Sequence, residues 1–183
     1  MKLAGEKTFE EDGKFWMAVG DFVYEYRAIY VCRIFSPDIW LESPLIKGAW
    51  KGIRAAGLPT KKNLNVKMNN NPHYGIKVTK KCEAFISLSI DETVDRLTGK
   101  FPIYFIVQKN GGKRVTRMST DLLAGGCKGP SSLKGVTASV TLDAPSYPYV
   151  FSMMCSTMYE KDESTFTVQI YCTDKSATII DDT

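Results

Sequence analysis

His73 lies among residue types that cysteine proteases use for catalysis. It is the only histidine in the 183-residue chain, with Asn71 just before it and Cys82 further along. A thiol nucleophile needs a base that a third group orients, together with an oxyanion hole, all held in a folded cleft. The sequence predicts no helix N-terminus that would activate Cys82. Because Asn71-Pro72 marks a turn, we interpret His73 as the start of a strand, and we predict no catalytic residue in this chain.

Acidic and cysteine side chains suggest metal binding as a second kind of chemistry. Two acidic clusters have the oxygen ligands that calcium prefers, but neither has the spacing of a calcium-binding loop, so we interpret them as solvated acids in turns. They are Asp91, Glu92 and Asp95, and Glu160, Asp162 and Glu163. The five cysteines include no Cys-x-x-Cys pair, which argues against zinc and favours reduced thiols. They are Cys32, Cys82, Cys127, Cys155 and Cys172. We expect this chain to bind no metal and no cofactor.

A basic stretch is the most distinct charge pattern, because no acidic residue occurs between Glu42 and Glu83. Such a stretch attracts anionic lipid headgroups or docks an acidic protein. The alternative is that strand alternation spreads its lysines over both faces as a solvated surface. No aromatic platform of a nucleic-acid-binding module is present, so we expect no nucleic-acid partner. The candidate lipid- or partner-binding residues are Lys61, Lys62, Lys67, Lys77, Lys80 and Lys81.

The elements that must position these residues differ between the two parts of the chain. Residues 1–36 predict a strand at 15–17, a helix over 19–26 and a second strand at 29–35. The helix is indicated by apolar residues at Val19, Phe22, Val23 and Tyr26, which share one face. Ser36-Pro37-Asp38 ends the second strand, so we place a domain boundary there. The two expected domains are 1–36 and 37–183.

Residues 37–183 predict short strands separated by turns. Apolar and polar residues alternate in segments 84–90, 136–142, 147–153 and 166–172, which is typical of strands with one buried face. The continuous apolar run 103–107 predicts a strand buried on both faces. Asn110-Gly111-Gly112 predicts a hairpin that leads into a strand at 114–118, and Gly125-Gly126 predicts a turn. Together these signals predict a mainly β fold, an antiparallel β-sandwich.

Composition excludes few functions. The chain is 44% apolar and 24% charged with a net charge of +4, which is ordinary globular composition. There is no signal-peptide pattern and no apolar run of transmembrane length. We therefore expect an intracellular protein that is cytoplasmic or associated with a membrane or the cytoskeleton.

Two groups of motifs resemble the calpain family of cysteine proteases. The first group resembles the end of the calpain protease core, and it consists of Asp12-Gly13-Lys14-Phe15-Trp16-Met17, Asp21-Phe22 and residues 29–33. The order Gly48-x-Trp50, Ala55-Ala56-Gly57 and Asn71-Pro72-His73-Tyr74 is similar to the opening of the calpain C2-like β-sandwich, also called domain III. The segment 166–171 fits the closing strands of that domain. The resemblance implies a strand–helix–strand remnant of the protease core followed by a C2-like sandwich.

Three departures from the family indicate a diverged, non-classical calpain-like protein. The catalytic Cys, His and Asn of the family belong upstream of Asp12. Typical calpains bind calcium partly through the acids of Asp-Gly-Glu, whereas Lys14 stands at the second acid here, so a calcium site of the parent is not supported in this chain. An acidic loop is expected after the Asn-Pro-x-Tyr motif, but 77–81 is basic.

The resemblance implies a non-catalytic regulatory or interaction domain of a calpain-like cysteine endopeptidase. Such a domain packs on the protease core of its parent, and the basic stretch adds acidic phospholipid or an acidic protein as a further partner. The alternative function is a membrane- or cytoskeleton-binding module of a calpain-like protein that has lost proteolysis. The substrate and the oligomeric state do not follow from these residues.

Overall fold

The computed structural model describes residues 16–26, 33–61, 63–90, 102–131 and 134–181. It divides into two compact units, Met1–Ile34 and Phe35–Thr183. Among the described residues, no helix has the length and apolar character that crossing a membrane requires.

The first unit contains one short helix, α1 (Val19–Glu25), as the apolar periodicity predicted. Asp21 lies in its first turn, where the helix dipole favours a negative charge. The two strands expected around it are not observed. Residue 15 and residues 29–32 lie outside the described part, and the described residues 16–17 and 33–35 are not strand.

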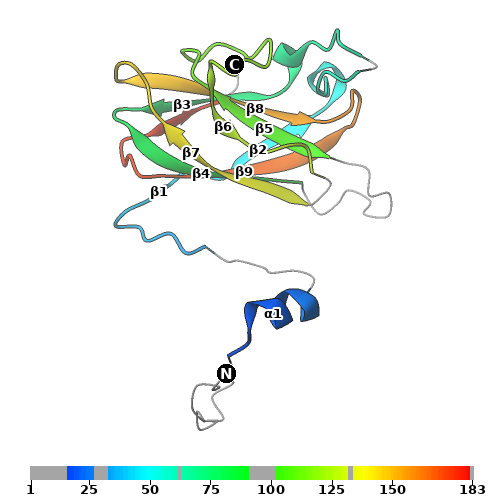
Figure 1. Ribbon diagram of the computed structural model, residues 1–183. Coiled ribbons are helices and arrows are strands. Elements are labelled where there is room, and N and C mark those ends of the chain that lie inside the picture. The colour runs from blue at the N-terminus through cyan, green and yellow to red at the C-terminus, as the bar shows by residue number, and fades with distance from the viewer. Residues whose placement is uncertain (1–15, 27–32, 62, 91–101, 132–133, 182–183) are drawn as a thin grey trace. The chain divides into compact units, whose positions relative to one another are not determined.

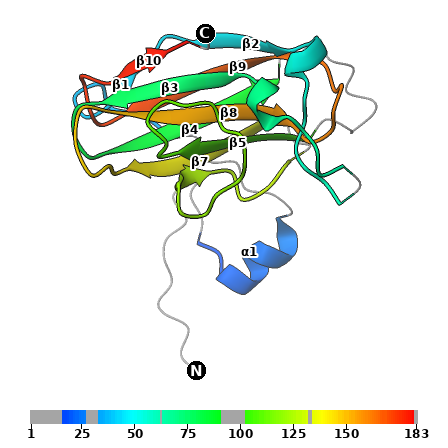
Figure 2. The same cartoon turned by 90° about the horizontal axis from the view of Figure 1, so that it is seen from above.

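The second unit is an antiparallel β-sandwich, which confirms the predicted fold class (Figure 1). The first sheet contains β1 (Leu41–Glu42), β2 (Ile46–Trp50), β4 (Cys82–Ile90), β7 (Gly135–Leu142) and β9 (Ser164–Cys172). The second sheet has the order β10 (Thr178–Ile180), β3 (His73–Val78), β8 (Tyr149–Thr157), β5 (Ile103–Gln108) and β6 (Leu123–Gly126). Figure 2 shows β10, β3, β8 and β5 of the second sheet side by side. Two 3-10 turns, Gly52–Arg54 and Met68–Asn70, lie in the connection between β2 and β3.

The main core lies between the two sheets, because alternate side chains of each strand point inward. Ile86 and Leu88 of β4 and Val168 and Ile170 of β9 are buried there. Trp50 at the end of β2 is also buried, and its indole N–H donates to the carbonyl of Cys155 at 3.1 Å. A second, smaller cluster covers the outer face of the second sheet, and it consists of Leu58, Met68, Ile106, Val115 and Met154.

The second cluster explains why strand β5 is buried on both faces, as its continuous apolar run predicted. Phe105 and Val107 face the main core, whereas Ile106 packs in the smaller cluster. The strand that we predicted at 114–118 is wrong, because this segment is irregular and Val115 packs into the smaller cluster instead.

Gly125-Gly126, predicted as a turn, belongs to strand β6, which pairs with β5. A side chain at Gly125 would lie 2.9 Å from Val140 of β7. Glycine is therefore used here for close packing between the sheets rather than for a bend.

Candidate functional site

His73 begins strand β3, as predicted, and both of its ring nitrogens are engaged in hydrogen bonds. It is only 5% exposed. Nδ1 lies 2.6 Å from the carbonyl oxygen of Asn71, and the backbone N–H of Val115 donates to Nε2 at 2.9 Å. Nδ1 therefore carries the proton and donates to Asn71. Burial lowers the pKa of His73 to about 4. The imidazole is thus neutral near pH 7 and connects the backbone at Asn71 to the backbone at Val115. Because both ring nitrogens are engaged in these hydrogen bonds, His73 cannot serve as a general base.

Cys82, the cysteine that a protease interpretation would pair with His73, lies at the other end of β3. The six residues of β3 and the turn after it separate the two, and a strand of this length spans roughly 20 Å. The partner of Cys82 is another thiol, Cys172 of β9, with 3.4 Å between the two Sγ atoms. The structure therefore does not bring His73 and Cys82 together.

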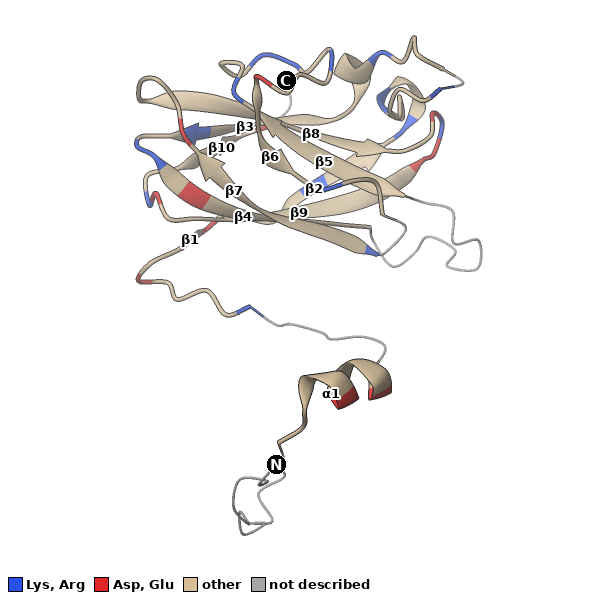
Figure 3. Ribbon diagram, in the orientation of Figure 1, with Lys and Arg blue, Asp and Glu red and all other residues tan. Residues whose placement is uncertain are grey.

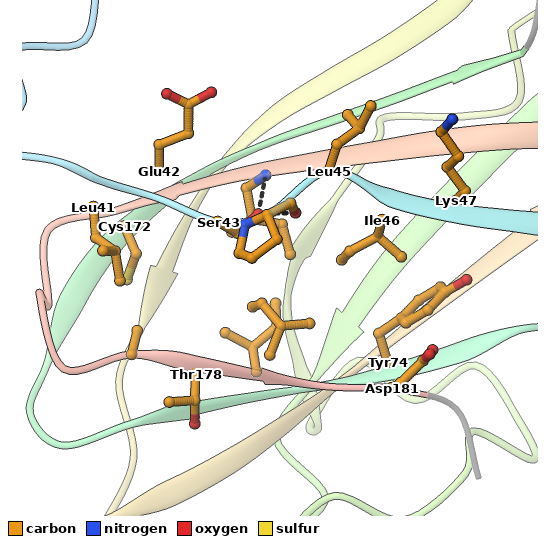
Figure 4. Close-up of a pocket in the computed structure, with 15 residues that line it drawn as sticks. Leu41, Glu42, Ser43, Leu45, Ile46, Lys47, Tyr74, Cys172, Thr178 and Asp181 are labelled. Atoms are coloured by element: carbon orange, nitrogen blue, oxygen red, sulfur yellow. Dashed lines mark hydrogen bonds between the residues drawn. The ribbon is translucent and has the colours of Figure 1, made fainter.

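An apolar groove of about 510 Å³ opens between an edge of the first sheet and an edge of the second (Figure 4). We call it the edge groove. One wall is made by β1, β2 and β9, and the other by β3 and β10. Apolar side chains from both sheets line it, including Leu41, Ile46, Tyr74, Ile170, Cys172 and Ile179. Glu42, Lys47 and Asp181 supply its charged groups, and Figure 4 shows Glu42 and Lys47 pointing away from the groove.

The edge groove exists because the first sheet's edge is interrupted between β1 and β2. Pro44 lies in this interruption and has no backbone N–H to donate to the strand ladder. Ser43 holds the interruption against β9 through three hydrogen bonds. Its N–H donates to the carbonyl of Ile170 at 2.8 Å, its hydroxyl accepts from the N–H of Ile170 at 3.2 Å, and its carbonyl accepts from the side chain of Gln169 at 2.7 Å. These hydrogen bonds fix the wall of the groove that β1 and β2 form.

The candidate lysines of the basic stretch fall into two separate groups. Lys61 and Lys67 are exposed in the connection before β3, and Lys62 lies outside the described residues. Lys77 is exposed on β3, as expected from strand alternation. Lys80 and Lys81 are exposed in the turn that follows.

These two groups lie at opposite ends of β3, so the described lysines do not form one continuous patch (Figure 3). Lys81 is also paired with Asp143, at 2.8 Å between Nζ and Oδ2. That hydrogen bond and charge raise the pKa of Lys81 and lower the pKa of Asp143. Binding of lipid or protein by these lysines stays a prediction.

The acidic clusters contribute to structure where they are described. The carboxylate of Glu163 accepts from the N–H of Gly52 at 2.7 Å, and that of Glu160 accepts from Asn63 at 3.4 Å. Within the described ranges, no group of three or more His, Cys, Asp or Glu residues is placed to hold a metal. Asp91, Glu92 and Asp95, like Asp12 and Lys14 of the calcium argument, lie outside the described part of the chain.

Sequence reasoning missed the edge groove and the Cys82–Cys172 pair. The groove depends on which strands become edges, and strand order is not encoded in any local pattern. The thiol pair left a usable signal, because both cysteines occupy inward positions in alternating segments. That alternation predicts a contact between the two cysteines only once β4 and β9 are known to be neighbouring strands.

Two plant proteases are similar to this chain in sequence. The calpain-type cysteine protease DEK1 of Zea mays is 24% identical over 179 residues, which cover 88% of this chain and 8% of the relative. The calpain-type cysteine protease ADL1 of Oryza sativa subsp. japonica is 30% identical over 99 residues, covering 51% of this chain and 4% of the relative. The resemblance to calpains is thus confirmed as a distant similarity over most of the chain. The chain spans less than a tenth of the length of either relative.

Two further comparisons carry no functional information. No family model matches the chain. A chain of the Israeli acute paralysis virus particle, solved as a full particle heated to 63 degree, shares 10% identity at a TM-score of 0.34 and covers 100% of this chain and 85% of that chain. This score is too low to support any conclusion.

Proposed function

We propose that this chain is a non-catalytic interaction domain of a calpain-type cysteine protease and that it packs against the protease core of its parent polypeptide. The β-sandwich and the similarity to a small segment of two calpain-type proteases support the proposal. The hydrogen bonds of His73 support the non-catalytic part, because they occupy the only histidine of the chain.

The observation that carries the docking proposal is the exposed apolar surface of α1. Within the described part of the first unit, Val19 and Val23 are 80% and 71% exposed, they share one face of the helix, and the helix buries no residue. The rings of Phe22 and Tyr26 stack with their centroids 4.8 Å apart, so these two side chains lie on the same face of the helix. Contiguous exposed apolar surface marks a site of interaction. Residues 1–36 resemble the end of the protease core, so the remainder of that core in the parent polypeptide is the partner that we propose for this face.

A binding titration tests the proposal. The chain is titrated into the separately produced protease core of its parent, and we expect a complex that is lost in the double variant Val19→Asp, Val23→Asp. Ile53→Asp is the matched control, since Ile53 is equally exposed but lies on the sandwich. A wild-type chain that forms no complex contradicts the proposal, and so does a complex that the helix variant leaves intact.

The compartment and the further partners belong to this same proposal. The described cysteines Cys82, Cys127, Cys155 and Cys172 are free thiols, which suits a reducing intracellular compartment, cytoplasmic or at a membrane or the cytoskeleton. Acidic phospholipid remains a second partner class, which would bind through Lys77 and Lys80 at one end of β3. The alternative function is a membrane- or cytoskeleton-binding module of a calpain-like protein that has lost proteolysis. The apolar face of α1 would still bind a partner in that case, but the complex would have no peptidase activity.

A further inference from the structure

We propose that Cys82 and Cys172 are a redox modification site at which hydrogen peroxide forms a reversible disulfide between strands β4 and β9. The two Sγ atoms are 3.4 Å apart, whereas a disulfide bond is about 2.05 Å long. The sulfurs therefore need to approach by about 1.4 Å to reach bonding distance.

The backbone around the two thiols is already fixed. Ala84 of β4 is paired with Cys172 of β9, so Cys82 is the diagonal neighbour of Cys172 on the same inward face. The N–H of Thr173 donates to the carbonyl of Glu83 at 2.9 Å, and the N–H of Glu83 donates to the hydroxyl of Thr173 at 2.9 Å. These bonds hold the strands in register and so keep the two thiols next to each other.

The edge groove gives a small oxidant access to the pair. Cys82 is 6% exposed and Cys172 is 2% exposed, so bulky reagents do not reach them from bulk solvent. Cys172, however, lines the edge groove, which is open and wide enough for peroxide (Figure 4). The site therefore selects small oxidants over large disulfides such as glutathione disulfide.

The two thiols have different roles in the reaction. Either sulfur can donate the hydrogen bond between the two thiols. That hydrogen bond and the backbone N–H of Asp174 lower the pKa of Cys172. The same hydrogen bond and burial raise the pKa of Cys82. Cys172 also lines the edge groove, whereas Cys82 does not, so Cys172 is the thiol that reacts first as a thiolate and Cys82 is the resolving thiol.

The chemistry balances with one peroxide. The Cys172 thiolate attacks one peroxide oxygen, the O–O bond breaks, and the departing hydroxide takes a proton to become water, which leaves a sulfenic acid. Cys82 then loses its proton and attacks the Cys172 sulfur, forming the S–S bond and releasing hydroxide, which that proton converts to a second water. Two thiols are oxidised and one peroxide is reduced.

Thiol counting and peptide mass spectrometry test the site. The reduced chain is treated with hydrogen peroxide, unfolded in the presence of an alkylating reagent, and digested without reduction. We expect a loss of two of the five thiols and one cross-linked peptide pair that joins Cys82 to Cys172, both reversed by dithiothreitol.

Single variants separate the two roles. Cys82→Ser should leave Cys172 as a sulfenic acid that dimedone traps when the chain is unfolded in its presence, whereas Cys172→Ser should leave the Cys82 thiol unmodified. Cys127→Ser is the control and should form the cross-link as the wild type does. Oxidation of all the cysteines at similar rates overturns the proposal, as does a cross-link through another cysteine or the absence of the cross-link.

Discussion

The backbone N–H of Val115 donates to Nε2 of His73 at 2.9 Å, and this bond fastens the loop after β5 onto the first residue of β3. The bond requires a neutral imidazole with its proton on Nδ1, where the carbonyl of Asn71 accepts it at 2.6 Å. His73, whose imidazole could in principle act as a catalytic base, is thus a structural residue whose hydrogen bonds connect two segments of the sandwich.

We expect His73 to make stability depend on pH between about 4 and 6.5. The unfolded chain takes up a proton near pH 6.5, whereas the folded chain does so only near pH 4. The contribution is therefore fully present above pH 6.5 and is lost as the pH falls from 6.5 towards 4, by up to about 3 kcal/mol. Urea unfolding of the wild type and His73→Gln at several pH values isolates this effect from that of the carboxylates. If the stability difference between the two proteins does not change with pH, the proposed neutral state is wrong.

A second stability prediction concerns the buried carboxylate of Asp174. It accepts from the N–H and the hydroxyl of Thr79 at 2.6 and 2.9 Å, and from the N–H of Ser176 at 3.0 Å. It joins the turn after β3 to the turn after β9. Asp174→Ala should lower the free energy of unfolding by about 1.5–3 kcal/mol, because part-buried hydrogen bonds to a charged acceptor are lost. Asp174→Asn retains one acceptor oxygen and should cost less. Equal stability of all three proteins in chemical denaturation would rule out this joining role.

The division of the lysines changes what we expect of lipid binding. Lys77 and Lys80 lie near one end of β3 and Lys61 and Lys67 near the other, so the two groups are separate candidate lipid contacts. Lys77→Glu with Lys80→Glu should reduce sedimentation with phosphatidylserine vesicles, whereas Lys61→Glu with Lys67→Glu should not. Binding should weaken as the Debye length falls from about 10 Å at 0.1 M salt to 3 Å at 1 M. Equal binding to neutral vesicles, or equal effects of the two double variants, contradicts this expectation.

We expect no peptidase activity from the isolated chain, with or without calcium. His73 is hydrogen-bonded on both ring nitrogens, and Cys82 has Cys172 as its neighbour. A casein-type substrate should remain intact in the presence of the purified chain. Hydrolysis that disappears in Cys82→Ala would show that a catalytic arrangement exists after all.

The sandwich was predictable because strand alternation is a local signal. Ile86 and Leu88 were placed correctly on the inner face of β4, and the continuous apolar run of β5 correctly predicted burial on both faces. The errors arose where tertiary packing decides the structure. Val115 is not in the expected hairpin strand, because it packs with Met68 and Ile106. Gly125 lies in a strand rather than a turn, and Val140 packs closely against it.

The candidate site was less predictable than the fold. The role of His73 as a strand-start residue followed from the turn before it. Its hydrogen-bond partner Val115 could not be predicted, because strands β4 and β5 lie between the two residues in the sequence. The edge groove depends on β10 and β2 lying at the same side of two packed sheets. No local pattern in the sequence contains that information.

Amide hydrogen exchange of α1 is the most direct test of docking on the protease core. Exchange at Val19–Glu25 is compared between the isolated chain and the full parent polypeptide. A seven-residue helix with no buried residue should exchange rapidly in isolation. If the protease core covers its apolar face, these amides should be strongly protected in the parent, and Val19→Asp with Val23→Asp should remove the protection. Equally fast exchange in both proteins would contradict the proposal that this chain packs against a protease core.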